Sequence, residues 1–164
     1  MQRNPEQGFR LLMGNYKEPI YWHIRRLVVS HIDAQDATQE AFVRIFRNFR
    51  QYRGEHSFKA WVFRIATNEA LRLIEQRHED TMSIDGVFSI QADSYVDYGD
   101  LEAVRLQKAI LCLPAKQQLV FNLRYYDELS YEEIAEVAGS SAASAKMNYH
   151  LAKEKIIKYM QKND

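Results

Sequence analysis

The chain has 164 residues, with 22 basic and 22 acidic side chains and a hydrophobic share of 46%. This length and composition suit a folded chain of one domain or two small ones. A single cysteine excludes an intramolecular disulfide framework. No apolar run approaches the roughly 18 residues that a membrane-spanning helix requires, and the N-terminal residues lack the apolar core of a signal peptide. We therefore expect a soluble, cytoplasmic protein.

The zero net charge is the sum of two basic blocks and an acidic connector. Arginine and lysine are concentrated in 44–64 and again in 146–162, whereas 81–100 contains four aspartates and no basic residue. Clustered basic residues are typical of nucleic-acid-binding domains, although a net charge of zero is not. The distribution therefore allows a nucleic-acid partner that the net charge alone argues against.

Apolar residues in the first half of the chain recur at helical spacing, and nothing alternates like a strand. We expect a helix over 9–29, interrupted near Pro19 because proline disfavours helical geometry in the residue before it. A second helix is expected over 33–52, and a third begins after the N-cap Ser57 and runs to about 77. The residues expected in the core stripes are Ala34, Ala37, Ala41, Phe42, Ile45, Phe46, Phe49 and Tyr52, then Phe58, Val62, Ile65 and Ile74.

The second half begins with a stretch without helical period, 80–99, whose Asp, Ser and Gly content predicts a linker. Cys112 lies in an apolar context and is expected to be a buried small hydrophobe. Proline is favoured in a helical first turn, which suits Pro114. The expected helices are about 101–112, 114–125, 130–138 and 141–160.

The segment LSYEEIAEVAGSS predicts two helices joined by a tight corner. Ser130 and Glu133 have the spacing of a capping box, and Gly139 can take the left-handed geometry that ends a helix. Ser141 can cap the next helix. This spacing is that of a helix-turn-helix, whose second helix lies in the DNA major groove, and the alternative is an ordinary helical hairpin. The expected inward stripes are Tyr131, Ile134, Ala135 and Ala138, then Ala142, Ala145, Tyr149, Ala152 and Ile156.

Two segments resemble a known family. Residues 113–156, from LPAKQQLVFNLRYY to HLAKEKI, resemble region 4 of bacterial sigma factors. Residues 33–74 are similar to region 2, through DAQDATQEAF, FRQYRG and FKAWVFRIATN. The order, spacing and short connector resemble the small extracytoplasmic-function (ECF) type. The resemblance implies an all-α fold of two small helical domains: region 2 over 1–79, with three or four helices, and a four-helix region 4 over 101–164. A flexible acidic linker over 80–100 joins them.

The resemblance implies a docking face for core RNA polymerase, on the clamp helices of its largest subunit. From the residues alone, exposed carboxylates beside an apolar side chain suit a protein interface with a basic partner. The alternative is a solvated helix face whose acids favour the helix dipole. The residues of this predicted face are Asp36, Gln39, Glu40, Val43 and Arg47.

The resemblance also implies recognition of the minus-ten element as single-stranded nontemplate DNA. Aromatic platforms and cationic side chains hold unpaired bases without covalent chemistry, and stacking contributes about 1–3 kcal/mol per base. Most apolar residues of this helix are expected to be core, and Trp61 could serve either role. The predicted minus-ten residues are Tyr52, Arg53, His56, Lys59, Trp61, Arg64, Asn68 and Arg72.

The second helix of the pair is expected to read the minus-thirty-five element as duplex DNA. Family members commonly have Ser-Arg where this chain has Met147 and Asn148, and often Arg where it has Leu151. Arginine makes the bidentate guanine contact, so the sequence predicts an upstream box that is either A/T-leaning or weakly read, with Asn148 available to pair with adenine and Met147 to touch a thymine methyl. The predicted residues are Ser141, Ala143, Ser144, Lys146, Met147, Asn148, His150 and Lys153.

Other functions remain as alternatives. The sequence contains no phosphate-binding loop, zinc-protease motif or paired cysteines, so we expect neither an enzyme nor a cofactor or metal. The first alternative is a helix-turn-helix regulator whose N-terminal helices bind protein, and the second is an adaptor without DNA affinity. The resemblance also implies an anti-sigma partner and an acidic linker that enters the polymerase cleft, although a simple soluble tether fits that linker equally well.

Overall fold

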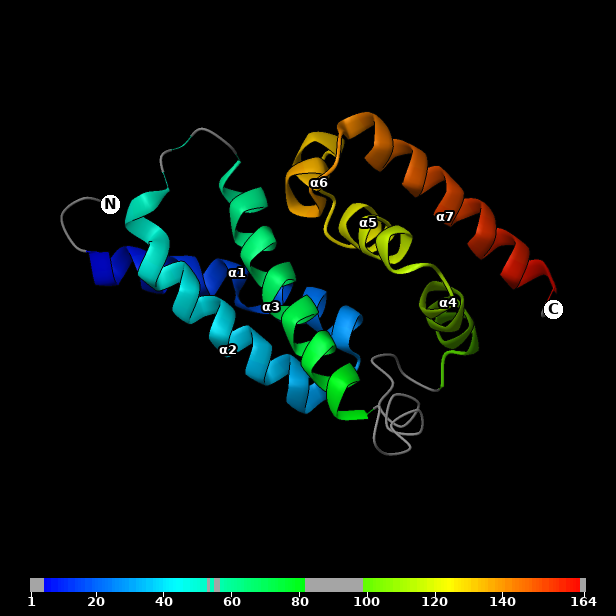
Figure 1. Cartoon of the computed structure of the whole chain (residues 1–164), viewed down its shortest axis with the longest axis horizontal. Helices are drawn as coiled ribbons and strands as arrows, with labels where there is room; N and C mark the ends of the chain where they lie inside the picture. Colours follow the sequence, from blue (N-terminus) through cyan, green and yellow to red (C-terminus); the bar gives the residue numbers. More distant parts are fainter. Residues whose placement is uncertain (1–4, 53, 55–56, 82–98, 163–164) are drawn as a thin grey trace. The chain divides into compact units, whose positions relative to one another are not determined.

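The computed structural model describes residues 5–52, 54, 57–81 and 99–162, and every regular element in them is a helix (Figure 1). The all-α prediction is thereby confirmed. The chain divides into two compact units, Met1–Asp93 and Ser94–Asp164. Most of the predicted linker lies outside the described residues. In the described residues, no helix is long and apolar enough to cross a membrane.

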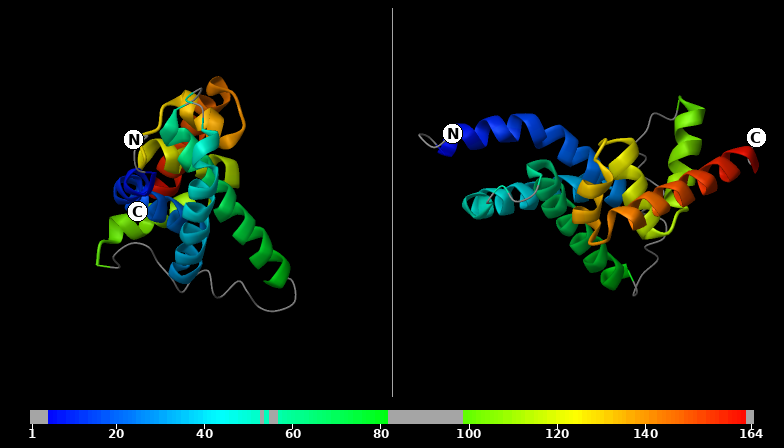
Figure 2. Two further views of the ribbon diagram at one scale, coloured as in Figure 1. Left: turned by 90° about the vertical axis from the view of Figure 1, so that its left-hand side faces the viewer. Right: turned by 90° about the horizontal axis from the view of Figure 1, so that it is seen from above.

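The described part of the N-terminal unit contains three long helices. They are α1 (Pro5–Val28), α2 (His31–Asn48) and α3 (Phe58–Thr81), and the short 3-10 helix η1 (Phe49–Gln51) follows α2. Each long helix packs against the other two, as the two views in Figure 2 also show. The predicted cap Ser57 accepts a hydrogen bond from the Ala60 amide at 3.2 Å. The core side chains come from all three helices and include Ile20, Ile24, Ala41, Ile45, Val62 and Phe63.

The predicted interruption at Pro19 is wrong, because α1 continues through it. An internal proline removes one backbone hydrogen bond and crowds the preceding turn. Here Pro19 itself is exposed, whereas the next residue, Ile20, is fully buried, as are His23 and Ile24 one turn further on. Burial of these side chains offsets the local cost and keeps the helix continuous.

Two residues predicted as core are exposed. Phe46 has an exposed fraction of 55% and Ile74 of 38%. Each stands at the end of a series of four-residue steps, after Phe42 and after Ala70. Because an α-helix has 3.6 residues per turn, every step of four moves the side chain further round the helix. At Phe46 and Ile74 the side chain has therefore left the buried face.

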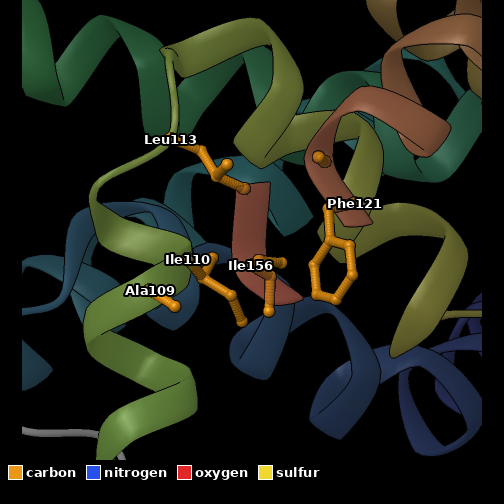
Figure 3. Close-up of a cluster of buried hydrophobic side chains, with 6 residues drawn as sticks. Ala109, Ile110, Leu113, Phe121 and Ile156 are labelled. Atoms are coloured by element: carbon orange, nitrogen blue, oxygen red, sulfur yellow. The ribbon is translucent and has the colours of Figure 1, made fainter. Parts of the chain in front are cut away.

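The C-terminal unit contains α4 (Leu101–Leu111), α5 (Ala115–Tyr125), α6 (Tyr131–Ala138) and α7 (Ala142–Lys162), close to the four predicted helices. Pro114 is the N-cap of α5 and lies one position before its first turn. Helix α7 packs against the other three. Side chains from α4, the turn after it, α5 and α7 form one buried cluster: Ala109, Ile110, Leu113, Phe121, Ala152 and Ile156. Figure 3 labels five of them, Ala109, Ile110, Leu113, Phe121 and Ile156.

The prediction for Cys112 is wrong, because its side chain is exposed. It is the C-cap residue of α4, and its neighbours Ile110 and Leu113 supply the buried side chains. The apolar neighbours Ile110 and Leu113 are therefore buried, whereas the Cys112 side chain between them is not.

Candidate functional site

The corner between α6 and α7 has the predicted capping chemistry. The Ser130 hydroxyl accepts a hydrogen bond from the Glu133 amide at 3.1 Å, and the Glu133 carboxylate accepts one from the Ser130 amide at 3.0 Å. Gly139 ends α6 in the left-handed conformation, with φ 68° and ψ 38°. The Ser144 amide then donates to the Ser141 hydroxyl at 3.0 Å and starts α7. The short helix α6 and the longer α7, joined by such a turn, form a helix-turn-helix.

The predicted minus-thirty-five residues differ in exposure. Buried Ala145, Ala152 and Ile156 hold the opposite face of α7 in the core. Ser144 and Asn148 are half-buried and contact each other, with the Asn148 amide nitrogen 3.5 Å from the Ser144 hydroxyl oxygen. The remaining predicted residues are exposed: Ser141, Ala143, Lys146, Met147, His150 and Lys153.

Aromatic rings fix α7 against the rest of its unit. Tyr149 stacks on Phe121 with centroids 5.8 Å apart, and the Lys153 ammonium lies 5.6 Å from the Tyr149 ring centre. The Arg124 guanidinium lies 4.6 Å from the centre of the Tyr131 ring. Burial, and then the neighbouring Tyr131, raise the pKa of Tyr149, so its hydroxyl stays neutral near pH 7.

Four predicted minus-ten residues share one face of α3. Trp61, Arg64, Asn68 and Arg72 follow one another at steps of three or four, which places them along a single stripe. Arg64, Asn68 and Arg72 are exposed, and Trp61 is half-buried. Lys59 does not join them, because its turn of the helix places it beside buried Val62 and Phe63. The predicted Arg53 and His56 lie outside the described residues.

An aromatic cluster lies at the N-terminal end of this stripe. The Tyr52 ring centroid is 5.4 Å from that of Trp61 and 5.1 Å from that of Phe58. Tyr16 of α1 adds a further ring, 5.9 Å from Phe58. Sequence reasoning missed Tyr16 as a member, because no local pattern links a residue of α1 to the start of α3.

A buried carboxylate connects the stripe to α2. Glu69 has an exposed fraction of 6% and forms ion pairs with Arg44 of α2 and Arg72 of α3, the latter at 3.2 Å. The two arginine side chains are 43% and 48% exposed. Arg72 therefore forms an ion pair with Glu69 inside the N-terminal unit, and the sequence did not predict this ion pair.

The predicted polymerase-binding residues lie on two sides of α2. Four of them, Asp36, Gln39, Val43 and Arg47, line a groove of about 1350 Å³ between α1 and α2, to which α1 contributes residues such as Trp22. Glu40 instead lines a notch of about 230 Å³ between α2 and α3, together with Asp36, Glu69 and Arg72. The α1 wall of the groove was not predicted, since its residues are far from α2 in the sequence.

The comparisons with known families match both units. The family model for sigma-70 region 2 matches residues 12–79, and the family model for sigma-70 region 4 matches residues 103–156. The ECF sigma factor SigW of Bacillus subtilis (strain 168) is 28% identical, over 98% of this chain and 93% of the relative. The ECF sigma-E factor of Escherichia coli (strain K12) is 28% identical over 95% and 88%. The sigma-H factor of Pseudomonas aeruginosa is 29% identical over 98% and 90%.

Two solved structures share the fold. The sigma factor RpoE of Bartonella quintana, solved with the anti-sigma factor NepR, matches with a TM-score of 0.80 and 22% identity over 94% of this chain and 98% of that one. CnrH, solved with the cytosolic domain of CnrY, matches with a TM-score of 0.77 and 19% identity over 99% and 93%.

A chain that pairs a three-helix sigma region 2 with a helix-turn-helix region 4 is a promoter-directing subunit of RNA polymerase. Its relatives over nearly the whole length are named as sigma factors, most of them of the ECF type. The protein belongs to the ECF RNA polymerase sigma factors, whose partners are core RNA polymerase and promoter DNA.

Proposed function

We propose that three surfaces divide the work of this sigma factor. The two sides of α2 bind the clamp helices of the polymerase. The exposed stripe of α3 and the aromatic cluster beside it hold the unpaired nontemplate strand of the minus-ten element. The outward face of α7 lies in the major groove of the minus-thirty-five element. The protein acts in the cytoplasm and needs no catalytic group or cofactor of its own, because positioning and strand capture are binding processes.

The polymerase surface is supported by its chemistry. Asp36, Gln39 and Glu40 are exposed polar groups, and the groove beside them also presents Trp22 and Phe46. Aromatic side chains rimmed by polar residues are typical of protein interfaces, and exposed carboxylates complement a basic partner. The five predicted residues act on both sides of α2, with Glu40 directed to the α3 side.

The strand-opening surface is supported by the combination of aromatic rings and cations. Trp61 and Tyr52 can stack on bases, while Arg64, Asn68 and Arg72 offer hydrogen-bond donors to phosphates or base edges. Stacking of about 1–3 kcal/mol per base offsets much of the cost of unpairing one or two bases. The predicted Arg53 and His56 belong to the segment that joins Tyr52 to α3, and Lys59 contributes less directly from its position beside the core.

An anti-sigma factor is the partner we propose for regulation. The supporting observation is that the similar sigma factor RpoE was solved in complex with the anti-sigma factor NepR. A partner that covers the α1–α2 groove of this chain competes directly with the polymerase.

The single observation that carries the proposal is the presence, in one chain, of a stripe on α3 that joins half-buried Trp61 to exposed polar and cationic side chains, and of a separately capped helix-turn-helix. A simple regulator requires only the second. The test combines a pull-down of core polymerase with in vitro transcription on a genomic fragment library. We expect core binding and initiation at discrete sites. DNA binding without either activity would favour the regulator alternative.

A further inference from the structure

Met147 is the most exposed of the large apolar side chains on the described part of α7, ahead of Ile157 and Leu151. Ala143, Met147 and His150 are exposed and follow one another at steps of four and three, so they lie along one line of the helix surface. Met147 has an exposed fraction of 61%. Ala143, one turn earlier, carries only a methyl group, so Met147 supplies most of the apolar surface along this line of α7.

The structure distinguishes between the two base contacts that the sequence suggested, one from Asn148 and one from Met147. Asn148 is half-buried, and its amide nitrogen lies 3.5 Å from the Ser144 hydroxyl oxygen, on the flank of α7. It would have to leave this position to form the bidentate contact that identifies adenine. Met147 needs no rearrangement, because its thioether side chain already points outward and adapts its shape easily.

The chemistry of the major groove offers one good partner for such a side chain. Thymine presents a 5-methyl group there beside its O4 acceptor, whereas the other three bases present no methyl group, and a thioether is only a weak acceptor for their polar groups. The flanking Lys146 and Lys153 are exposed cations suited to phosphate contacts. We infer that Met147 is a specificity-determining residue of α7 and reads the 5-methyl group of a thymine in the upstream promoter box. This inference rests on the proposed function of α7.

The test removes only the methyl group from the DNA. Promoter duplexes selected by the holoenzyme from a randomised library are resynthesised with deoxyuridine in place of each upstream-box thymidine in turn. Burial of one methyl group corresponds to about a fourfold change in affinity. We expect at least one position where deoxyuridine weakens holoenzyme binding about fourfold, and no such loss with the Met147→Ala variant.

Three controls keep the result specific. The conservative variant Met147→Leu should retain the methyl dependence, and Leu151→Ala, which truncates an exposed apolar residue one turn later on α7, should leave it unchanged. Placing 5-methylcytosine instead of cytosine at the sensitive position should recover part of the binding, because it restores the same methyl group.

The outcomes are distinguishable. Equal binding of thymidine and deoxyuridine duplexes at every position, in a holoenzyme that still selects an upstream box, overturns the inference alone. Methyl dependence that persists in Met147→Ala also overturns it. A holoenzyme that selects no upstream box at all removes the proposed role of α7 and the inference with it.

Discussion

Removing both arginines that flank Glu69 should destabilise the N-terminal unit far more than removing Glu69 itself. Glu69 is 6% exposed, whereas the side chains of Arg44 and Arg72 are 43% and 48% exposed. The double substitution Arg44→Ala and Arg72→Ala leaves a buried carboxylate without either of its observed partners. Glu69→Ala leaves two guanidinium groups that water can solvate.

The burial of the three groups sets the magnitudes. Breaking a buried ion pair by removing its partner costs about 3–5 kcal/mol, because the remaining charge stays uncompensated. Because the two arginine side chains are 43% and 48% exposed, water screens each ion pair with Glu69, and each pair contributes about 1 kcal/mol or less. We therefore expect the double arginine variant to lose about 3–5 kcal/mol in the free energy of unfolding. We expect Glu69→Ala to lose only about 1–2 kcal/mol.

The two tryptophans of the chain allow the measurement in the intact protein. Trp22 and Trp61 both belong to the N-terminal unit, so tryptophan fluorescence follows its unfolding in urea without interference from the other unit. Arg64→Ala, which truncates an exposed arginine elsewhere on α3, is the matched control and should change stability by less than about 0.5 kcal/mol. Adding Glu69→Gln to the double arginine variant should recover part of the loss, because the buried charge is removed.

A Glu69→Ala variant as unstable as the double arginine variant would refute this reasoning. It would mean that the carboxylate stabilises the fold through more than its two arginines. Full stability of the double arginine variant would refute it equally, since the buried charge would then have another partner.

Three further predictions concern the C-terminal unit. Glu128 is exposed with φ 57°, so Glu128→Gly should stabilise the unit by about 0.5–1 kcal/mol in thermal unfolding followed by circular dichroism. Asn122 is fully buried, and its side-chain amide has no hydrogen-bond partner within the described residues, so Asn122→Leu should add about 1–3 kcal/mol by the same measurement. Burial raises the pKa of Tyr149 above 10.0, so folding favours the protonated form and stability should fall as pH rises past 10. Tyr149→Phe should reduce that alkaline loss.

A different result would contradict each of these three predictions. The control for Glu128→Gly is Glu154→Gly, in the middle of α7, which should destabilise the C-terminal unit by about 1 kcal/mol. A similar loss of stability in Glu128→Gly would show that the backbone at Glu128 carries no strain. A loss of stability in Asn122→Leu would show that the amide is satisfied. An identical alkaline decline in wild type and Tyr149→Phe would assign that decline to other groups.

Local chemistry made much of the C-terminal unit predictable. The capping box of Ser130 and Glu133, the left-handed Gly139 and the cap Ser141 each act within a few residues, so their spacing in the sequence is sufficient to place the corner. Helix α1 is the opposite case. Pro19 was expected to interrupt it, but burial of Ile20 and Ile24 against distant helices decided the outcome.

The candidate site was predicted less completely, because its geometry is tertiary. The common stripe of Trp61, Arg64, Asn68 and Arg72 follows from helical spacing alone. The buried Glu69 that holds Arg72 could not be identified without knowing that Arg44 of α2 lies opposite. The division of the predicted polymerase-binding residues between two sides of α2 likewise required the positions of α1 and α3.

The central claim is that α3 holds an unpaired strand while α7 lies on duplex DNA. The most direct test uses promoter DNA with the fluorescent base 2-aminopurine in the nontemplate strand of the minus-ten element, mixed with holoenzyme. We predict a fluorescence rise on binding, reduced at least about fivefold in rate or extent by combined Trp61→Ala and Asn68→Ala substitution, with core binding retained, since the loss of one base stack corresponds to about 1–3 kcal/mol. An unchanged rise in that variant, or a holoenzyme that binds the promoter and never unpairs it, would contradict the account.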